Sequence, residues 1–339
     1  MIVVTGANGF IGANMVKRLN AMGETGVVVV DDYPSIRDTE GTTVAPKNDH
    51  YAHGFGEGAV GLYIDMHDFA AWLGTDAADA VTGIVHMGAC SDTTVTDREY
   101  VMRVNLKYTT MLWDWCTKRG VNFVYASSAA TYGDGTQGYS DEMDPGIYKP
   151  LNLYGESKHR FDLWALKQEK TPPRWAGMKY FNVYGPMELH KGRMASVALH
   201  TYKQIKETGK MKLFMSHKDG IADGEQLRDF VFVEDVVEMS LYLLNESVSK
   251  DAPNSLYNAG TGKARSFLDF AKAVFAGLGM EPEIEFIPMP VDLRGQYQYF
   301  TQATMRKMMG AGYDRPIHCL EDGVKKYVSY LEGLLGGDR

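Results

Sequence analysis

The sequence contains few cysteines: Cys90, Cys116 and Cys319 are the only three in 339 residues. Three thiols cannot all pair with one another, and their spacing matches no zinc-binding motif. The nine histidines are scattered, and no serine, histidine and aspartate follow the order of a hydrolase triad. We therefore expect a protein of the reducing cytoplasm, without a metal site and without a hydrolase site.

The sequence also lacks a long apolar run and an excess of positive charge. No apolar run approaches the ~20 residues of a membrane-spanning helix. The first predicted strand begins so close to Met1 that we expect no signal peptide. The formal net charge of −8 is the opposite of the basic face that nucleic acid requires. We expect neither a membrane nor a nucleic acid as a partner.

The most informative segment is rich in glycine and lies near the start of the chain. The β-branched run 2–4 precedes Thr5-Gly6-Ala7-Asn8-Gly9-Phe10-Ile11-Gly12, and apolar residues at helical spacing follow. A second apolar run, 27–30, then ends on Asp31 and Asp32. A strand, a glycine turn, a helix and a strand with an acidic end are typical of a dinucleotide-binding unit.

Each glycine of this segment has a physical role in such a unit. Gly6 permits the tight turn, Gly9 lets the backbone approach a pyrophosphate, and Gly12 lets the helix pack close to the sheet. The N-terminus of the helix offers free N–H groups and a partial positive charge to the phosphates. The sequence therefore predicts cofactor contacts at Gly6, Gly9, Gly12, Asp31 and Asp32.

Short apolar segments alternate with helical patterns as far as about residue 184. The predicted strands are 1–5, 27–30, 83–87, 122–126 and 175–180, and the clearest helices are 100–119 and 157–169. Strands separated by helices predict an α/β protein with a Rossmann-type, doubly wound parallel sheet and ligands at the carboxyl ends of its strands. The segment 38–61, rich in Thr, Gly, His and Lys, is predicted to be a surface loop.

After residue 184 the alternation breaks, which predicts a smaller, interwoven α/β lobe. The expected elements are helices at 195–208, 232–244, 266–278 and from about 301 and 320, and strands at 255–259 and 283–287. We assign residues 1–183, with about 229–258, to a dinucleotide-binding domain. Residues 184–228 and 259–335 are assigned to a substrate-binding lobe, and a substrate is expected in the cleft between the two.

Two further segments indicate a reaction centre. The strand at 122–126 runs into Ser127 and Ser128 at the ligand-facing edge, and Tyr154 and Lys158 share one face at the start of a helix. A phenol with a pKa of about 10 is a poor base, but a nearby ammonium and an oxidised nicotinamide lower that pKa. Tyr154 is then expected to take the proton of a substrate hydroxyl, with Ser128 bonded to the same oxygen. The alternative is that Tyr154 and Lys158 are surface residues.

These motifs resemble the extended short-chain dehydrogenase/reductase family of nucleotide-sugar enzymes, also called the NAD-dependent epimerase/dehydratase family. The glycine segment, Tyr125-Ala126-Ser127-Ser128 and Tyr154-x-x-x-Lys158 carry the resemblance. Within the family the chain is most similar to the 6-epimerases of ADP-heptoses, through the segments 88–91, 126–133, 180–186, 228–231 and 295–298. The most discriminating segment is His190-Lys191-Gly192-Arg193-Met194-Ala195-Ser196, which most sugar-nucleotide epimerases lack.

The resemblance implies epimerisation at C6 of ADP-D-glycero-D-manno-heptose to the L-glycero form, a step in the synthesis of lipopolysaccharide core precursors. In that reaction C6 is oxidised and then reduced on its other face with a bound nicotinamide cofactor. A proton acceptor is needed for each of two substrate orientations, and the family implies Tyr154 and Lys191. Taken alone, Lys191 would belong to a solvated or phosphate-binding patch. The family also implies a homo-oligomer.

The resemblance further implies which residues contact the ligands. Cofactor contacts besides the three glycines and two acids are Phe10, Ile11, Met87, Gly88, Ala89, Cys90, Ser91, Asn105, Tyr154, Lys158, Val183 and Lys191. Substrate contacts are Asn182, Arg193, Ser196, His200, Phe214, Met215, Ser216, His217, Arg228 and Tyr297. Arginine suits phosphate oxygens because its planar fork matches them. For each of these residues a packing or surface role is the alternative.

The choice of nicotinamide cofactor stays open. The resemblance implies NADP, but Asp31 and Asp32 repel a 2′-phosphate and suit the ribose hydroxyl of NAD. Arg37 could neutralise the two acids, whereas the loop from Ser35 onward lacks the lysine of the family. Met87 is a second departure, because the family usually carries an acid at this position.

Other functions fit parts of the pattern. A UDP-hexose 4-epimerase shares most of the motifs. A 4,6-dehydratase is disfavoured, because Ala129-Ala130-Thr131 after Ser128 includes no acid. A net reductase would consume its cofactor, and a catalytically silent cofactor-binding protein would not need Ser128, Tyr154, Lys158 and Lys191 together.

Overall fold

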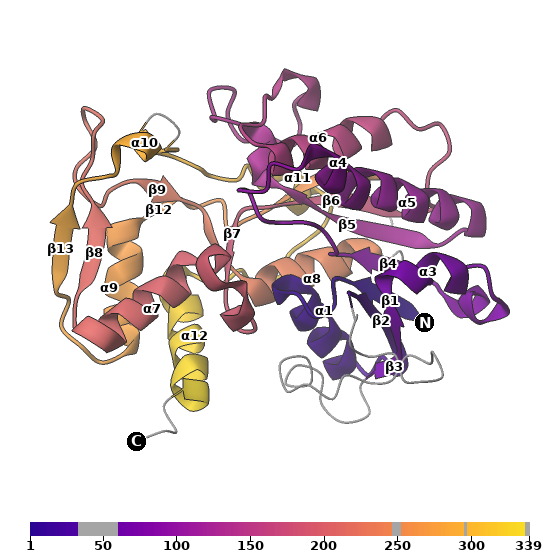
Figure 1. Ribbon diagram of the computed structural model, residues 1–339, viewed down its shortest axis with the longest axis horizontal. Helices are drawn as coiled ribbons and strands as arrows, with labels where there is room; N and C mark the ends of the chain where they lie inside the picture. Colours follow the sequence, from indigo (N-terminus) through magenta and orange to yellow (C-terminus); the bar gives the residue numbers. More distant parts are fainter. Residues whose placement is uncertain (33–59, 246–251, 295–296, 336–339) are drawn as a thin grey trace.

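Seven parallel strands form the central sheet, in the order β11-β6-β5-β4-β1-β2-β3 (Figure 1). The computed structural model describes residues 1–32, 60–245, 252–294 and 297–335. The strands are β1 (Ile2–Thr5), β2 (Val27–Asp31), β3 (Val60–Asp65), β4 (Gly83–His86), β5 (Asn122–Ser128), β6 (Trp175–Tyr180) and β11 (Ser255–Ala259). Every neighbouring pair is parallel. The predicted Rossmann-type sheet is confirmed.

Each face of the sheet has its own core, because successive residues of a strand point to opposite faces. On one face, Val4 of β1 packs in a cluster with helices α1 (Phe10–Ala21) and α8 (Val233–Leu244). On the other face, Val3 packs in a cluster with the helices α3 (Met66–Trp72), α5 (Tyr108–Arg119) and α6 (Leu153–Ala165). Burial on both faces explains why these strands are continuous apolar runs in the sequence.

The direction of the strand order reverses between β1 and β4. β2 and β3 extend the sheet beyond β1, whereas β5, β6 and β11 extend it beyond β4. The connections therefore leave in opposite directions and open a crevice at the carboxyl ends of β1 and β4, where ligands bind in sheets of this type.

The second part of the chain forms three small two-stranded sheets around a separate core. The pairs are β7 (Asn182–Tyr184) with β10 (Phe230–Phe232), β8 (Met211–Phe214) with β13 (Ile284–Ile287), and β9 (Leu227–Arg228) with β12 (Arg265–Ser266). Helices α7 (Val197–Thr208), α9 (Phe267–Gly277) and α12 (Leu320–Leu335) contribute to that core. This part lies beside the central sheet, on the left in Figure 1. The residue boundaries of the two lobes stay a prediction.

The structure differs from the predicted helices in three places. α6 begins at Leu153 rather than at 157, because Asn152 caps it by accepting the N–H of Gly155 at 2.8 Å. The helix predicted at 100–119 consists of α4 (Arg98–Met102), one π-helical turn (Arg103–Lys107) and α5. The helix predicted from about 301 is the short α11 (Arg306–Gly310), which follows α10 (Val291–Arg294).

One strand of the central sheet escapes prediction. β3 has Gly61 near its start, and only its last two residues, Ile64 and Asp65, are buried, so its apolar pattern is short. Of the predicted surface loop 38–61, residues 38–59 lie outside the described residues, as does Arg37, whereas residues 60–61 belong to β3. In the part of the chain that the structure describes, no helix has both the length and the apolar character needed to cross a membrane.

Candidate active site

The glycine turn between β1 and α1 is closely packed and exposes backbone. Gly6 has a φ of +64°, and a Cβ at this residue would lie 2.5 Å from the backbone N of Gly88. A Cβ at Gly12 would lie 2.0 Å from the carbonyl oxygen of Gly6. Gly9, the N-cap of α1, makes no side-chain cap, so the first N–H groups of the helix are left for a ligand. The turn fits the pyrophosphate of a dinucleotide.

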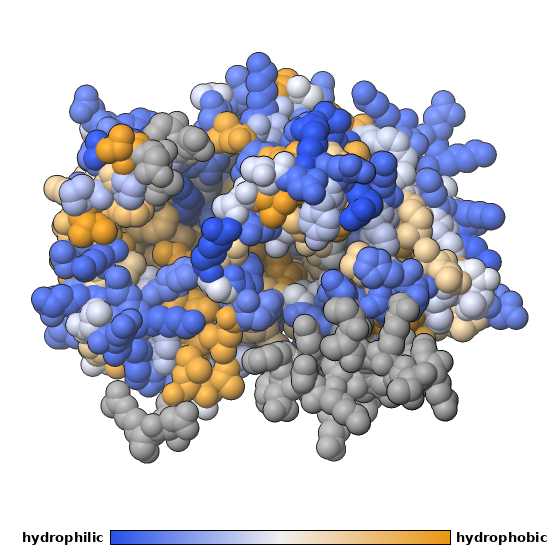
Figure 2. All heavy atoms as spheres, viewed as in Figure 1, coloured by the Kyte–Doolittle hydropathy of each residue, from blue (hydrophilic) through white to orange (hydrophobic). Residues whose placement is uncertain are grey.

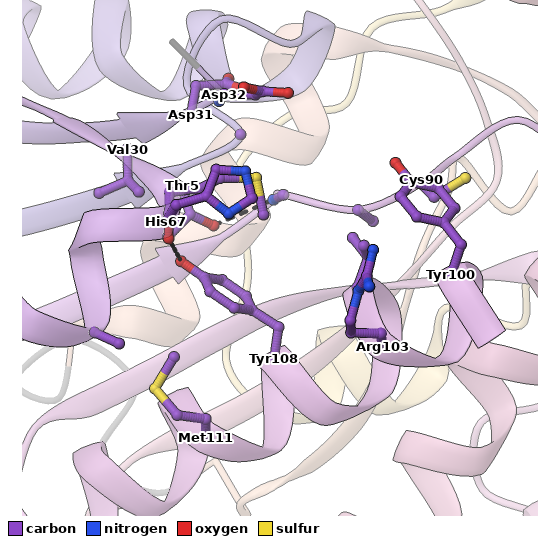
Figure 3. Close-up of a pocket in the computed structure, with 16 residues that line it drawn as sticks. Thr5, Val30, Asp31, Asp32, His67, Cys90, Tyr100, Arg103, Tyr108 and Met111 are labelled. Atoms are coloured by element: carbon purple, nitrogen blue, oxygen red, sulfur yellow. Dashed lines mark hydrogen bonds between the residues drawn. The ribbon is translucent and has the colours of Figure 1, made fainter. Parts of the chain in front are cut away.

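Two cavities share this turn. The β2–β4 cavity has a volume of about 660 Å³, and residues of β2, α3, the π-helical turn and α5 line it (Figure 3). The interlobe cavity has a volume of about 900 Å³ and is lined by residues of both parts of the chain. The space-filling view shows polar side chains over most of one face, with hollows between the two parts (Figure 2). Residues in the walls of both cavities are Gly6, Asp31, Asp32, Gly88 and Ala89.

Asp31 and Asp32 lie together where the two cavities meet (Figure 3). The Asp31 carboxylate accepts the backbone N–H of Asn8 at 2.7 Å and that of Asp32 at 2.8 Å. Burial raises the pKa of Asp31, and these hydrogen bonds lower it in part. Among the described residues of the β2–β4 cavity, Arg103 is the only lysine or arginine. It lies near Cys90 and Tyr100, on the side away from the two acids (Figure 3).

Ser128, Tyr154 and Lys158 meet in the wall of the interlobe cavity. Ser128 ends β5 and forms a hydrogen bond with Tyr154, which lies in the first turn of α6. Lys158 follows one turn later and is buried. Burial lowers the pKa of Lys158 to about 8, although the Asp162 carboxylate raises it in part. The structure thus brings the three predicted catalytic side chains together.

The pKa of Tyr154 differs from the sequence-based expectation. Burial raises the pKa of this phenol, and the hydrogen bond with Ser128 lowers it only in part. The Asp162 carboxylate adds to the increase. The lowered pKa expected from a neighbouring ammonium is therefore wrong for the protein's own groups, because the desolvation of the phenolate dominates.

The predicted cofactor contacts in the loop after β4 line the two cavities, whereas Asn105 does not. Met87, Gly88, Ala89 and Ser91 line the interlobe cavity, and Cys90 lines the β2–β4 cavity. Asn105 is buried, lines neither cavity, and holds the loop from behind. Its Oδ1 accepts the N–H of Cys90 at 2.8 Å, and its Nδ2 donates to the Cys90 carbonyl and to Ser157 Oγ, each at 2.9 Å. Asn105 therefore ties the loop to α6.

Lys191 lies over the glycine turn, on the segment 189–194. Its Nζ is 5.2 Å from the centre of the Phe10 ring, and both residues line the interlobe cavity with Ile11. Burial lowers the pKa of Lys191, and the Glu188 carboxylate raises it in part. Glu188 is fully buried and accepts both the N–H and the hydroxyl of Ser196 at 2.5 Å. Its carbonyl accepts the N–H of Lys191 at 3.0 Å, so Glu188 fixes the segment that carries Lys191.

The predicted substrate contacts divide into three sets. Asn182, Val183 and Ser196 line the interlobe cavity, although Val183 is predicted to contact the cofactor. Arg193 and His200 are exposed and lie outside its wall. Arg193 instead forms an ion pair with Asp92 at 3.3 Å.

The third set gathers around Arg228 at the end of β9. The Arg228 guanidinium lies 5.2 Å from the centre of the Tyr297 ring and 5.5 Å from that of Phe267. Tyr297 packs edge-on against Phe214, at a centroid distance of 6.4 Å. Burial lowers the pKa of Arg228, and no carboxylate in the described ranges forms an ion pair with it. A buried cation without a counter-ion favours an anionic ligand.

The residues after β8 complete this set. The N–H of Ser216 donates to Asp223 at 2.7 Å, and the N–H of His217 donates to the Tyr299 hydroxyl at 3.0 Å. Met215 lies between them and Phe214 and is exposed. Gly295 and Gln296, which precede Tyr297 in the family motif, lie outside the described residues.

Several residues that line the cavities are not predicted from the sequence. His67 of α3, Arg103 of the π-helical turn and Tyr108 of α5 line the β2–β4 cavity. These side chains come from helices whose orientation depends on the packing of the whole sheet. Asn8 also lines the interlobe cavity, and its place inside the glycine segment is a signal that would have found it.

Comparison with known proteins identifies the family. The model of the NAD dependent epimerase/dehydratase family matches residues 2–260. The chain is 44% identical to an ADP-L-glycero-D-manno-heptose-6-epimerase of Fusobacterium nucleatum subsp. nucleatum, over 98% of this chain and 98% of that protein. A solved Helicobacter pylori ADP-L-glycero-D-manno-heptose-6-epimerase is similar at 28% identity with a TM-score of 0.75, over 98% of this chain and 96% of that one. A Thermus thermophilus UDP-glucose 4-epimerase in complex with NAD is similar at 25% identity with a TM-score of 0.72, over 98% and 99%. The chain belongs to the NAD dependent epimerase/dehydratase family.

Proposed function

We propose that the protein is an isomerase that converts ADP-D-glycero-D-manno-heptose to its C6 epimer, ADP-L-glycero-D-manno-heptose. The observation that carries the proposal is the interlobe cavity, whose wall combines Ser128, Tyr154 and Lys158 with Lys191 beside the glycine turn. Relatives with this epimerase name match the chain nearly end to end, which supports this substrate over a UDP-hexose.

The residues of the chain fit a nicotinamide dinucleotide. The glycine turn and the N–H groups of α1 would hold the pyrophosphate, and Asp31 would hold a ribose hydroxyl. The family model and a structural neighbour with NAD support this class of cofactor. When bound, the nicotinamide supplies the redox chemistry, because it accepts a hydride from the sugar carbon and gives it back.

We expect the cofactor to be NAD rather than NADP. A 2′-phosphate would bring negative charge against Asp31 and Asp32, and Arg103 lies on the other side of the cavity (Figure 3). NADP, which the family resemblance implies, is the alternative. Titration calorimetry with both nucleotides distinguishes them: tighter binding of NAD is expected, and tighter binding of NADP would contradict this preference.

Tyr154 and Lys191 would act as the two acid–base groups. In one orientation of the sugar, Tyr154 takes the proton of the C6 hydroxyl as C6 becomes a ketone, and Ser128 donates a hydrogen bond to the same oxygen. After the ketone presents its other face, Lys191 gives a proton to that oxygen as C6 is reduced. The positive charges of Lys158 and of an oxidised nicotinamide would offset part of the increase that burial causes in the pKa of Tyr154. Burial lowers the pKa of Lys191, which makes proton exchange by its amine easier than at an exposed lysine.

The residues around Arg228 would hold the ADP part of the substrate. A guanidinium that is buried between Tyr297 and Phe267 can pair with a diphosphate oxygen. The aromatic edge formed by Phe214 and Tyr297 offers a surface for a base. This placement would leave the heptose to extend toward Asn182 and the interlobe cavity.

NMR of purified protein incubated with ADP-D-glycero-D-manno-heptose tests the proposal. We expect the L-glycero epimer to accumulate with no net oxidation or reduction. The matched control is Tyr154→Phe, which loses only the hydroxyl and is expected to turn over at least ~100-fold more slowly. Conversion of UDP-glucose but not of the ADP-heptose would favour a 4-epimerase, and no conversion of either would favour a silent cofactor-binding protein. The homo-oligomer and the cytoplasmic location stay predictions.

A further inference from the structure

A buried ion pair lies behind the proposed catalytic side chains. Lys179 Nζ on β6 is 2.7 Å from Asp162 Oδ2 on α6, and the two side chains are 1% and 0% exposed. A buried pair adds little stability by itself, because desolvation of both charges offsets their attraction. The hydrogen bonds that Asp162 and Lys179 make to other residues indicate a second role for the pair.

Asp162 joins α6 to the end of β5. Its Oδ1 accepts the hydroxyl of Tyr125 at 2.9 Å, and its Oδ2 accepts that of Ser127 at 2.7 Å. Asp162 follows Tyr154 by eight residues and Lys158 by four, so the three lie on one face of α6. The carboxylate therefore links the helix that carries Tyr154 and Lys158 to the residue before Ser128.

Lys179 is connected to Ser128 through the side chain of Thr131, on the C-terminal side of Ser128. Its Nζ donates to Thr131 Oγ1 at 2.7 Å, and the Thr131 hydroxyl donates to the Ser128 carbonyl at 2.7 Å. The same ammonium lies 5.1 Å from the centre of the Tyr132 ring. Ser128 is thus held through Ser127 by one member of the ion pair and through Thr131 by the other.

We propose that Asp162 and Lys179 are positioning residues of the active site, which hold Ser128 on β5 in place relative to Tyr154 and Lys158 on α6. The proposal rests on the proposed function, because it gives a role to groups behind the proposed reacting atoms. It predicts that changes in this network alter both the protonation of Lys158 and the turnover number.

The charged and titratable groups around Lys158 make a change in its protonation measurable. The groups that interact with the charge of Lys158 are Asp162 on α6, His86 at the end of β4 and Cys90 in the loop after it. Burial and the charge of Lys158 hold the pKa of His86 at about 3, so this imidazole is neutral. Burial raises the pKa of the Cys90 thiol. Asp162 therefore supplies the negative charge that favours the ammonium form of Lys158.

NMR of ¹³C-labelled lysine in the protein without added substrate follows the protonation of Lys158, with the signal assigned by Lys158→Met. The wild type is expected to titrate near pH 8. Asp162→Asn is expected to lower this midpoint by about one pH unit. The matched control is Asp235→Asn on α8, which removes another buried carboxylate, the one that lies 2.8 Å from His318 Nδ1. The control should keep the wild-type midpoint, because a loss of packing alone does not shift it.

Thr131→Val tests the positioning role without removing either charge. This variant keeps the size of the side chain but breaks the link from Lys179 to Ser128, so kcat for the ADP-heptose should fall about tenfold while KM changes little. A wild-type kcat in Thr131→Val, or an unshifted Lys158 midpoint in folded Asp162→Asn, would overturn the proposal. If the wild type does not epimerise ADP-heptose, the proposed function fails, and the lysine titration still decides whether Asp162 sets the charge of Lys158.

Discussion

The ammonium of Lys191 lies 5.2 Å from the centre of the Phe10 ring. Phe10 begins α1 at the glycine turn, whereas Lys191 belongs to the segment that precedes α7. The contact brings an amine from the second part of the chain to the turn that would hold the cofactor. In the proposed mechanism this amine is the second acid–base group, and Tyr154 is the first.

Lys191→Met removes this amine and keeps the length of the side chain. We expect the rate of epimerisation to fall at least ~100-fold, because one of the two proton transfers loses its group. Binding of the nucleotide cofactor should persist, since the glycine turn is unchanged. Conversion is followed by NMR and cofactor binding by calorimetry, with Lys203→Met on the exposed face of α7 as the control. A normal epimerisation rate in Lys191→Met would show that two bases are not needed.

Arg228→Ala and Arg193→Ala separate two arginines that the family motifs treat alike. Arg228 is buried between aromatic rings, so we expect its loss to raise the KM for the ADP-heptose by about 10- to 100-fold. Arg193 is exposed and pairs with Asp92, so its loss should change KM by less than about fivefold. Steady-state kinetics gives both values, and a larger effect from Arg193 would mean that this side chain turns into the cavity when substrate binds.

Gly12→Ala places a methyl group where the glycine turn has no room. Its Cβ would lie 2.0 Å from the carbonyl oxygen of Gly6, so the turn must move. We expect a loss of about 1–3 kcal/mol of stability and a loss of cofactor binding, measured by thermal unfolding and calorimetry. Gly310→Ala in α11 is the control, because nothing lies within 4 Å of its Cβ, and a gain of up to ~1 kcal/mol is expected there. Unchanged cofactor affinity in Gly12→Ala would contradict the role of the turn.

His86 predicts a specific loss of stability in acid. Its Nδ1 lies 2.6 Å from Thr5 Oγ1 and its Nε2 2.9 Å from Thr109 Oγ1. Burial lowers the pKa of His86 from 6.5 to about 3, so the folded protein gains this proton less readily than the unfolded chain. The contribution of His86 to the free energy of unfolding is fully present above pH 6.5 and is lost as the pH falls toward 3. The loss between pH 7 and pH 4 amounts to about 3 kcal/mol. Urea unfolding at several pH values should show this dependence in the wild type and a flatter one in His86→Gln, and equal slopes would contradict it.

Local sequence was sufficient where the site depends on residues that are consecutive. The turn from Gly6 to Gly12 and the acids at the end of β2 follow from a strand, a helix and the next strand of one unit. Tyr154 and Lys158 share a face because they are one helical turn apart. These relationships need no knowledge of how distant segments pack.

Sequence could not reveal contacts that depend on tertiary packing. Nothing in the local sequence marks Glu188, yet it is fully buried and fixes Ser196. Asp162 and Lys179 are 17 residues apart and meet only because α6 packs on the sheet beside β6. The protein's own groups raise the pKa of Tyr154 for the same reason, since spacing in the sequence indicates which charges are near but not how deeply a side chain is buried. The family resemblance implies that Arg193 and His200 contact the substrate, which stays a prediction; both are exposed and lie outside the wall of the interlobe cavity.

The fate of a deuterium on C6 of ADP-D-glycero-D-manno-heptose tests the central claim most directly. Transient oxidation moves the C6 hydrogen as a hydride that leaves and returns within one site, so it never exchanges with water. The account predicts that the L-glycero product formed in ordinary water keeps its deuterium at C6, as measured by NMR or mass spectrometry. Loss of the deuterium to water at the rate of epimerisation would show that the hydrogen leaves as a proton, and would contradict the account.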